Sequence, residues 1–227
     1  MGAGAGRGPL VVFEGAEGAG KTTQVARLVA RAAALGIACE SYREPGGTPL
    51  GDAVRALVLT PGHDVRPRAE ALLFMAARAQ LLAHVAERLA AGVAVVLDRF
   101  FLSTYAYQIA GRGLPADDVR AANRLATAGV VPDLTLLLTA DADEARARVG
   151  RRGGLDRMER EDAAFHARVA AAFDAATAPA WQAAHPEVGR VVRVDGGGTA
   201  DAVAARVAAA LADGLPETFG ALRESHS

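Results

Sequence analysis

The stretch LVVFEGAEGAGKTT, residues 10–23, joins a short apolar run to a glycine-rich turn that ends in a lysine and two threonines. The run at residues 10–13 is typical of a buried strand, and helical periodicity follows the turn as far as Gly36. Residues 15–22 match the pattern G-x-x-x-x-G-K-[ST] between a strand and a helix, which is the context that this pattern requires. The stretch therefore predicts a phosphate-binding loop in a nucleotide-binding fold.

Each position of this loop suits the binding of phosphate. The glycines let backbone N–H groups turn toward a phosphate, and the helix that begins there adds the positive end of its dipole. Lys21 brings a charge that can reach the β- and γ-phosphates, and the hydroxyl of Thr22 suits Mg²⁺. The residues that we expect to bind ATP are Gly15, Ala16, Glu17, Gly18, Ala19, Gly20, Lys21, Thr22 and Thr23.

The composition limits the class of protein. The chain has 227 residues, a net charge of -1 and a single cysteine, Cys39. The charge argues against a generally basic nucleic-acid binder, and one cysteine allows no internal disulfide. No apolar run reaches the ~20 residues of a membrane span, and residues 1–9 lack the apolar centre of a signal peptide. We therefore expect a soluble cytoplasmic protein.

Four further short runs predict strands, and helical segments separate them. The predicted strands cover residues 10–13, 38–42, 93–97, 134–138 and 191–194, and the predicted helices cover residues 21–35, 50–59, 68–91 and 199–212. Continuous apolar strands separated by helices indicate a doubly wound α/β fold, with a five-stranded parallel sheet and helices on both faces. We expect one domain over residues 10–212, a flexible tail at residues 1–9 and a frayed tail at residues 213–227.

Asp98 ends the third predicted strand, where P-loop enzymes place a carboxylate on the Mg²⁺ side of the nucleotide. We therefore expect Thr22 and Asp98 to hold Mg²⁺. A P-loop by itself does not distinguish a small-molecule kinase from a switch or binding NTPase. Guanine-specific switches read the base with an N-K-x-D motif, and the only asparagine of this chain, Asn123, precedes an arginine. The kinase class is favoured.

A kinase must also hold an anionic acceptor and exclude water during transfer. Arg99 directly follows the third strand, and Arg55 and Arg78 lie on the helices before it. A further group of arginines surrounds glycines late in the chain, at Arg146, Arg148, Arg151, Arg152, Arg157 and Arg160. Because arginine suits phosphate oxygens and glycine suits movement, this segment predicts a lid over about residues 148–160.

Four blocks of the sequence, together with the lid segment, resemble bacterial-type thymidylate kinases, and the resemblance covers about residues 10–212. The blocks are FEGAEGAGKTT at residues 13–23, REPGGTPLG at 43–51 with Arg55 after it, LLFMAARAQ at 72–80, and DR with STYAYQ within 98–108; the lid segment is RRGGLDRME at 151–159. The resemblance implies transfer of the γ-phosphoryl group of ATP to dTMP, which gives dTDP on the way to dTTP, with Mg²⁺ and in a homodimer.

The same resemblance implies how the base of the acceptor is bound. Phe74 would stack on thymine, and Arg78 would donate a hydrogen bond to a base carbonyl. Thr104 and Gln108 would complete the polar contacts to the base edge.

The resemblance also implies how the sugar and the phosphate are bound. Arg55 and Arg99 would hold the monophosphate. Glu17 would lie near the sugar hydroxyl, and Tyr107 would fill the space of a 2′-hydroxyl, which disfavours ribonucleotides.

Some members of the family carry an arginine in the loop after the acidic residue, where this chain has Gly18. Charge on the transferring phosphoryl group would then come from the lid, as in the bacterial type. Arg157 is one candidate for this role, but we favour Arg151 or Arg152. The predicted catalytic residues are Lys21, Asp98, Arg99, Arg151 and Arg152.

A deoxynucleoside kinase is the alternative within the enzyme class. Such an enzyme phosphorylates a neutral 5′-hydroxyl and needs a carboxylate base near it, with less positive charge around the acceptor. The pair Arg55 and Arg99 fits an anionic acceptor better.

Overall fold

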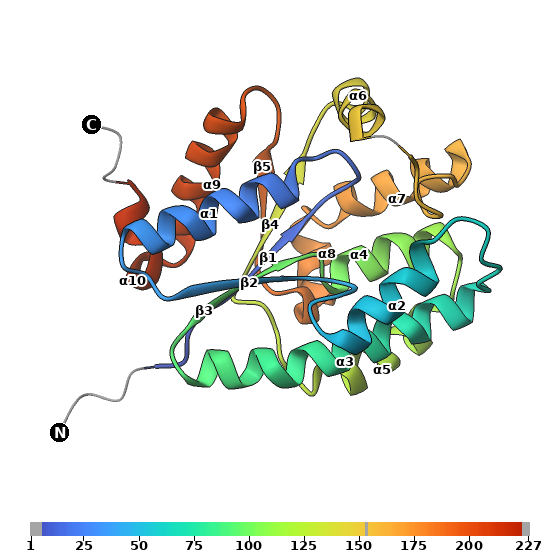
Figure 1. The fold of residues 1–227 in the computed structure, drawn as a ribbon, viewed down its shortest axis with the longest axis horizontal. Helices are drawn as coiled ribbons and strands as arrows, with labels where there is room; N and C mark the ends of the chain where they lie inside the picture. Colours follow the sequence, from blue (N-terminus) through green and yellow to red (C-terminus); the bar gives the residue numbers. More distant parts are fainter. Residues whose placement is uncertain (1–5, 153, 224–227) are drawn as a thin grey trace.

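The computed structural model describes residues 6–152 and 154–223, apart from the side chains of Ala142, Arg151 and Arg152. A five-stranded parallel sheet of order β2-β3-β1-β4-β5 runs through its centre (Figure 1). The strands are β1 (Leu10–Glu14), β2 (Cys39–Arg43), β3 (Ala94–Asp98), β4 (Leu134–Thr139) and β5 (Val191–Asp195). Each overlaps the strand that the sequence predicted, and the doubly wound α/β class is confirmed.

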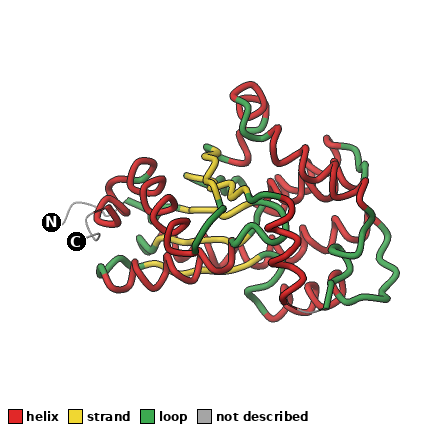
Figure 2. Tube along the Cα trace, turned by 90° about the horizontal axis from the view of Figure 1, so that it is seen from above, coloured by secondary structure: helices red, strands yellow, loops and turns green. Residues whose placement is uncertain are grey.

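Helices cover both faces of the sheet (Figures 1 and 2). One face carries α1 (Lys21–Ala34), α9 (Ala200–Gly214) and α10 (Pro216–Phe219). The other carries α3 (Pro67–Ala90), α4 (Phe101–Thr104), the π-helix η1 (Tyr105–Gly111), α5 (Ala116–Thr127) and α7 (Ala163–Ala175). The remaining elements are α2 (Pro49–Leu59), α6 (Ala142–Arg152), α8 (Pro179–Ala184), η2 (Pro186–Val188) and η3 (Gly220–Arg223).

Strand β1 shows why this sheet is buried on both faces. Its side chains alternate in direction, so that Leu10 and Val12 join the core under α3 and η1, while Val11 and Phe13 join the core under α1 and α9. All four are fully buried. A continuous apolar run is thus what a strand between two helical layers requires.

The order of the strands brings two loops together. β1 pairs with β3 on one side and with β4 on the other, and all three strands are parallel. The strands before β4 in the sequence lie on one side of β1, and β4 and β5 lie on the other side, so the order of the strands changes direction at β1. Phe13 is in register with Asp98, and the phosphate-binding loop after β1 therefore lies next to the turn after β3. Ligands of such sheets bind at this point, outside the carboxyl ends of the strands.

The sequence analysis assigned no helix between β3 and β5 and predicted only a mobile lid there, over about residues 148–160. The structure has several there, and the segment Tyr105–Gly111 is a π-helix. Its backbone is closed by a bond from Arg112 N to Tyr107 O of 2.9 Å. A π-turn has no periodicity of its own in a sequence and arises from tertiary packing.

Both predicted tails differ from expectation where the structure describes them. Arg7 forms an ion pair of 2.7 Å with Asp133, and Gly8 N donates to Leu89 O at 2.8 Å, so the chain is held from residue 7 onward. After residue 212 the chain continues through α10 and η3, and Phe219 and Leu222 are fully buried under α1 and α9. Residues 213–223 are therefore held against the core by these two side chains and do not show the predicted fraying, whereas residues 1–5 and 224–227 lie outside the described residues.

Helix α3 is long and apolar enough to cross a membrane by length and composition alone. It instead packs against α2, α5 and β3, and 44% of its most apolar stretch is buried inside the protein. Two of its buried side chains, Glu70 and Arg78, carry charge and point toward partners within the fold. The helix is thus a core element of this domain.

Replacing Phe219 by alanine is expected to destabilise the protein by about 3–5 kcal/mol, because a fully buried aromatic side chain is lost from the core. Glu217→Ala, in the same short helix but exposed, is the matched control and should change stability by less than about 0.5 kcal/mol. Denaturant unfolding of the three proteins measures both effects. Equal stability of Phe219→Ala and wild type would mean that the end of the chain is frayed in solution.

Candidate active site

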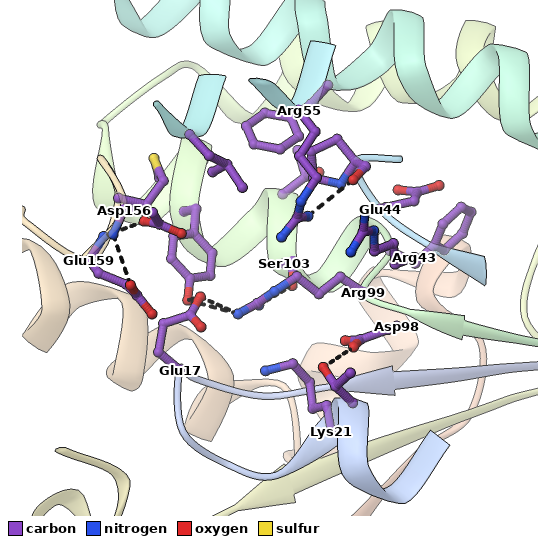
Figure 3. A pocket seen from close by; sticks show the side chains of 18 of the residues that line it. Glu17, Lys21, Arg43, Glu44, Arg55, Asp98, Arg99, Ser103, Asp156 and Glu159 are labelled. Atoms are coloured by element: carbon purple, nitrogen blue, oxygen red, sulfur yellow. Dashed lines mark hydrogen bonds and ion pairs between the residues drawn. The ribbon is translucent and has the colours of Figure 1, made fainter. Parts of the chain in front are cut away.

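A cavity of about 420 Å³ opens at the carboxyl ends of β1 and β3 (Figure 3). The predicted site residues that line it are Glu17, Gly18, Gly20, Lys21, Thr22, Thr23, Arg55, Phe74, Arg78, Asp98, Arg99, Thr104, Tyr107 and Gln108. Gly15, Ala16 and Ala19 belong to the same loop but do not line the cavity. The tertiary structure thus gathers residues from four separate parts of the sequence around one space.

The phosphate-binding loop is packed so closely that two positions admit only glycine. A Cβ on Gly15 would lie 2.2 Å from Leu138 O, and a Cβ on Gly18 would lie 2.3 Å from Ala145 O. Both glycines also have positive φ angles, which other residues rarely adopt. The backbone of α6 therefore occupies the space in which a side chain at position 18 would lie.

Lys21 folds back over its own loop. Its Nζ donates to Gly15 O and Ala16 O, both at 2.9 Å, and the side chain is buried. Burial, assisted by the nearby charge of Arg99, lowers the pKa of Lys21 from 10.5 to about 8. Phosphate oxygens at this position would replace the carbonyls as partners and favour the charged amine.

Thr22 and Asp98 come together from the start of α1 and the end of β3. The hydroxyl of Thr22 donates to Asp98 Oδ2 at 2.6 Å. A hydroxyl and a carboxylate are oxygen ligands of the kind that Mg²⁺ accepts, and Mg²⁺ in such sites completes its shell with water and substrate phosphates. Two adjacent oxygen ligands next to a phosphate-binding loop fit the metal.

Arg99 is held in place by four groups. It donates to Ser103 Oγ at 2.9 Å and Gly15 O at 3.2 Å, pairs with Glu17, and contacts the phenol of Tyr107. Although burial alone lowers the pKa of Arg99, the carboxylate of Glu17 and then Tyr107 raise it above the ordinary value. Its φ of 74° is rare for a residue other than glycine, and such strain occurs mainly at functional sites.

Glu14 supports this arrangement, although the sequence analysis did not single it out. It is fully buried, and its Oε1 accepts hydrogen bonds from Phe100 N at 2.8 Å and Ser103 N at 2.9 Å. Burial raises its pKa, while the hydroxyl of Ser103 and the charge of Arg99 oppose that shift. The position of the acid, directly before a glycine-rich loop at the end of a buried strand, was the available signal.

The guanidinium of Arg78, to which the resemblance assigns a base carbonyl, also has several partners within the protein. Its Nε and Nη2 donate to Glu44 Oε2 at 2.8 and 2.6 Å, its Nη1 donates to Asn123 Oδ1 at 2.8 Å, and its Nη2 also reaches Thr104 Oγ1 at 3.2 Å. The guanidinium lines the cavity but is directed mainly at partners within the protein. These bonds use four of the five N–H groups of Arg78, and among the described residues the second N–H of Nη1 has the weak acceptor Met75 Sδ at 3.9 Å as its partner, so a contact with a base stays a prediction.

Glu44 is the buried partner of Arg78 and was also missed. Its side chain is 5% exposed, and its Oε1 is buried without a hydrogen-bond partner. Burial raises the pKa of Glu44, and the charge of Arg78 opposes this shift. A buried carboxylate requires such a partner, so its position fixes where the guanidinium lies.

Arg55 enters the cavity from α2 and faces the end of β3 (Figure 3). Its Nη1 donates to Pro45 O at 3.1 Å. Burial, together with the neighbouring charge of Arg43, lowers the pKa of Arg55. Arg43, Arg55 and Arg99 all line this part of the cavity, so it suits an anion.

The arginines of the lid lie in different environments. Arg148 of α6 donates to Gly18 O at 3.3 Å and Gly196 O at 3.1 Å, which places it beside the phosphate-binding loop. Arg157 instead pairs with Glu70 and donates to Val58 O at 2.7 Å. The side chains of the favoured candidates, Arg151 and Arg152, lie outside the described residues, so their role stays a prediction.

Arg148 was in the predicted lid but not among the predicted catalytic residues. It lies within the arginine-rich segment that predicted the lid, and that segment was the available signal.

These features define a class of protein, the P-loop phosphotransferases that act on an anionic acceptor. They are the parallel doubly wound sheet, the phosphate-binding loop with a hydroxyl–carboxylate pair beside it, and the cationic part of the cavity lined by Arg43, Arg55 and Arg99. The model of the thymidylate kinase family matches residues 13–184. A thymidylate kinase of Synechococcus sp. (strain JA-3-3Ab) is 46% identical over 201 residues, which cover 87% of this chain and 92% of the relative. One of Deinococcus radiodurans is 42% identical over 208 residues, which cover 91% of this chain and 98% of the relative.

The chain belongs to the thymidylate kinase family. It is a nucleoside monophosphate kinase that transfers the γ-phosphoryl group of ATP to dTMP and produces dTDP. The resemblance found in the sequence is thereby confirmed, and the deoxynucleoside kinase and the switch NTPase are not supported.

The lowered pKa of Lys21 gives a testable pH dependence. Below about pH 8 the free protein holds Lys21 charged; as the pH rises through 8 the amine loses its proton, so ATP affinity should fall. ATP binding at pH 8.5 should take up roughly 0.75 proton at this site, because the phosphates restore the charge. Calorimetric titration in two buffers of different ionisation enthalpy measures the uptake.

Lys21→Arg is the matched variant for this experiment, since arginine keeps its charge throughout the pH range. It should lose the uptake that wild type shows at pH 8.5. Identical proton uptake in the two proteins would assign the titration to another group.

Proposed function

We propose that dTMP occupies the cavity with its phosphate between Arg55 and Arg99 and its base beside Phe74. The observation that supports this orientation is the separation of charge within the cavity. Arg43, Arg55 and Arg99 lie near the phosphate-binding loop, and Phe74, Thr104 and Gln108 lie on the part of the wall formed by α3, α4 and η1. A nucleoside monophosphate carries its charge at one end and its planar base at the other.

In this orientation Glu17 and Tyr107 would contact the sugar. Tyr107 Oη donates to Glu17 Oε1 at 3.2 Å, and the ring of Tyr107 packs against Phe165 and Phe173. The packing supports a role of bulk, because a ring held by other rings cannot move aside for a 2′-hydroxyl.

Thr22 and Asp98 would hold Mg²⁺, which would neutralise charge on the ATP phosphates during transfer. Lys21 would reach the β- and γ-phosphates once its bonds to the loop carbonyls are exchanged for phosphate oxygens. Arg99 would align the phosphate of dTMP with the γ-phosphoryl group, and Arg148 would add charge from the side of α6. Because the acceptor phosphate is already a nucleophile at neutral pH, alignment and charge neutralisation are sufficient and no strong base is needed.

Replacement of Arg55 by methionine tests the acceptor site. The variant should lose about 1.5–3 kcal/mol of interaction with dTMP, so kcat/KM for dTMP should fall roughly ten- to a hundredfold while KM for ATP changes little. Arg190→Met is the control, since Arg190 is exposed next to the start of β5, at the other edge of the sheet.

The assay compares dTMP, dUMP, dCMP, dGMP, AMP and thymidine as acceptors with ATP and Mg²⁺. Preference for thymidine over dTMP would contradict the proposed phosphate site. If the Arg55→Met variant loses interaction with ATP and with dTMP equally, Arg55 does not bind the phosphate of the acceptor.

We further propose that the protein is a cytoplasmic homodimer whose contact includes α3 and α5. These helices pack against each other, and they expose Leu72 and Leu125 by 62% and 86%. Exposed leucines on neighbouring helices are suited to burial against a second copy.

Sedimentation equilibrium at micromolar concentration should give about twice the single-chain mass of 23.3 kDa. The double variant Leu72→Glu, Leu125→Glu should shift the protein toward the monomer, because it would bury two charges. Leu155→Glu, at an exposed leucine of the lid, should leave the dimer intact. A single-chain mass for the wild type would contradict the dimer.

A further inference from the structure

Glu70 is a fully buried carboxylate of α3 that receives side chains from two other parts of the chain. Gln108 Nε2 donates to its Oε1 at 2.9 Å. Arg112 donates to Oε1 at 3.2 Å and to Oε2 at 3.0 Å, and Arg157 also donates to Oε2. Both oxygens of Glu70 are thereby occupied, although the cavity lies next to this group.

These contacts fix the direction of the Gln108 amide. A carboxylate only accepts hydrogen bonds, so the NH₂ group of Gln108 must face Glu70 and its Oε1 must face the opposite way. Gln108 lines the cavity, and among the described residues its Oε1 accepts no hydrogen bond. The amide thus presents an acceptor, and not a donor, to a ligand.

A hydrogen-bond acceptor at this place distinguishes thymine from cytosine. The ring N3 of thymine carries a hydrogen and donates, whereas the ring N3 of cytosine is an acceptor. A fixed amide oxygen would accept a hydrogen bond from N3–H of thymine. Against cytosine it would face the N3 acceptor, and two unpaired acceptors in a pocket without water are strongly unfavourable.

We propose that Glu70 is a positioning residue for base selection: it locks the Gln108 amide with Oε1 toward the base and so excludes dCMP. The inference rests on the proposed orientation of dTMP. Arg112 and Arg157 contribute to this arrangement, because they fix the carboxylate of Glu70, which in turn fixes the amide of Gln108. Arg157 also ties the lid to α2 through Leu59 O, at 2.9 Å from its backbone N, and Val58 O.

Glu70→Gln tests the proposal with almost no change of shape. Arg112 Nη2 and Arg157 Nη2 both donate to the Oε2 position, whereas of the arginines only Arg112 Nε donates to the Oε1 position, at 3.2 Å. The amide oxygen of the new side chain should therefore lie at Oε2, and its NH₂ should face Gln108. Gln108 must then turn over and present its own NH₂ to the base. The ratio of kcat/KM for dTMP to kcat/KM for dCMP should therefore fall at least tenfold, because dTMP loses a bond that dCMP gains.

Glu161→Gln is the matched control. Glu161 also pairs with Arg112, at 2.7 Å, and in the described part of the chain Gln108 donates to Glu70 and not to Glu161. The substitution Glu161→Gln takes a charged partner away from Arg112. It should leave the ratio of kcat/KM for dTMP to kcat/KM for dCMP within about twofold of wild type. A ratio in Glu70→Gln equal to that of wild type would overturn the proposal, even if both rates fell, since a purely structural role lowers both nucleotides together.

A spectroscopic measurement on the wild-type protein covers the case in which Glu70→Gln does not fold. The side-chain amide protons of Gln108, assigned by comparison with Gln108→Leu, should stay hydrogen-bonded and nearly unshifted when dTMP is added. A large shift of these protons on binding would mean that the NH₂ group faces the base, which contradicts the proposal. Failure of the wild type to prefer dTMP over dCMP would overturn the role of Glu70, whereas the Arg55→Met variant tests the proposed phosphate site independently.

Discussion

The buried carboxylate of Glu14 connects the two strand ends on which the active site is built. It closes β1 and accepts the backbone N–H groups of Phe100 and Ser103, at 2.8 and 2.9 Å, at the start of α4. Ser103 in turn accepts a hydrogen bond from Arg99. The phosphate-binding loop and the turn after β3 are therefore fixed relative to each other before any nucleotide binds, which is the preorganisation that phosphoryl transfer needs.

Charged side chains buried in α3 shape the acceptor end of the cavity in a similar way. Arg78 is matched with Glu44, and Glu70 is matched with Arg112 and Arg157. Removing one partner of such a pair leaves an uncompensated buried charge, which costs about 3–5 kcal/mol. The pairs therefore restrict the side chains that contact the base to one arrangement, and selectivity and stability depend on the same contacts.

The donor end of the site is less fixed. Lys21 bonds to the carbonyls of its own loop, and Arg148 bonds to carbonyls on either side of it. These groups are acceptors that phosphate oxygens can replace, so binding of ATP exchanges one set of partners for another. The amine is thus held close to the position that phosphate would occupy, and its burial there is the main cause of the lowered pKa of Lys21.

The sequence by itself determined the strands, the phosphate-binding loop and the pair Thr22 and Asp98, because apolar runs and local spacing are set by residues close together in the chain. It also identified the family, through motifs that are local. Only the tertiary structure decided the π-helix that carries Gln108, the buried end of the chain at Phe219, and the carboxylates Glu14 and Glu70. Each of these depends on partners distant in the sequence, and a buried charge is recognisable only when the opposite charge beside it is known.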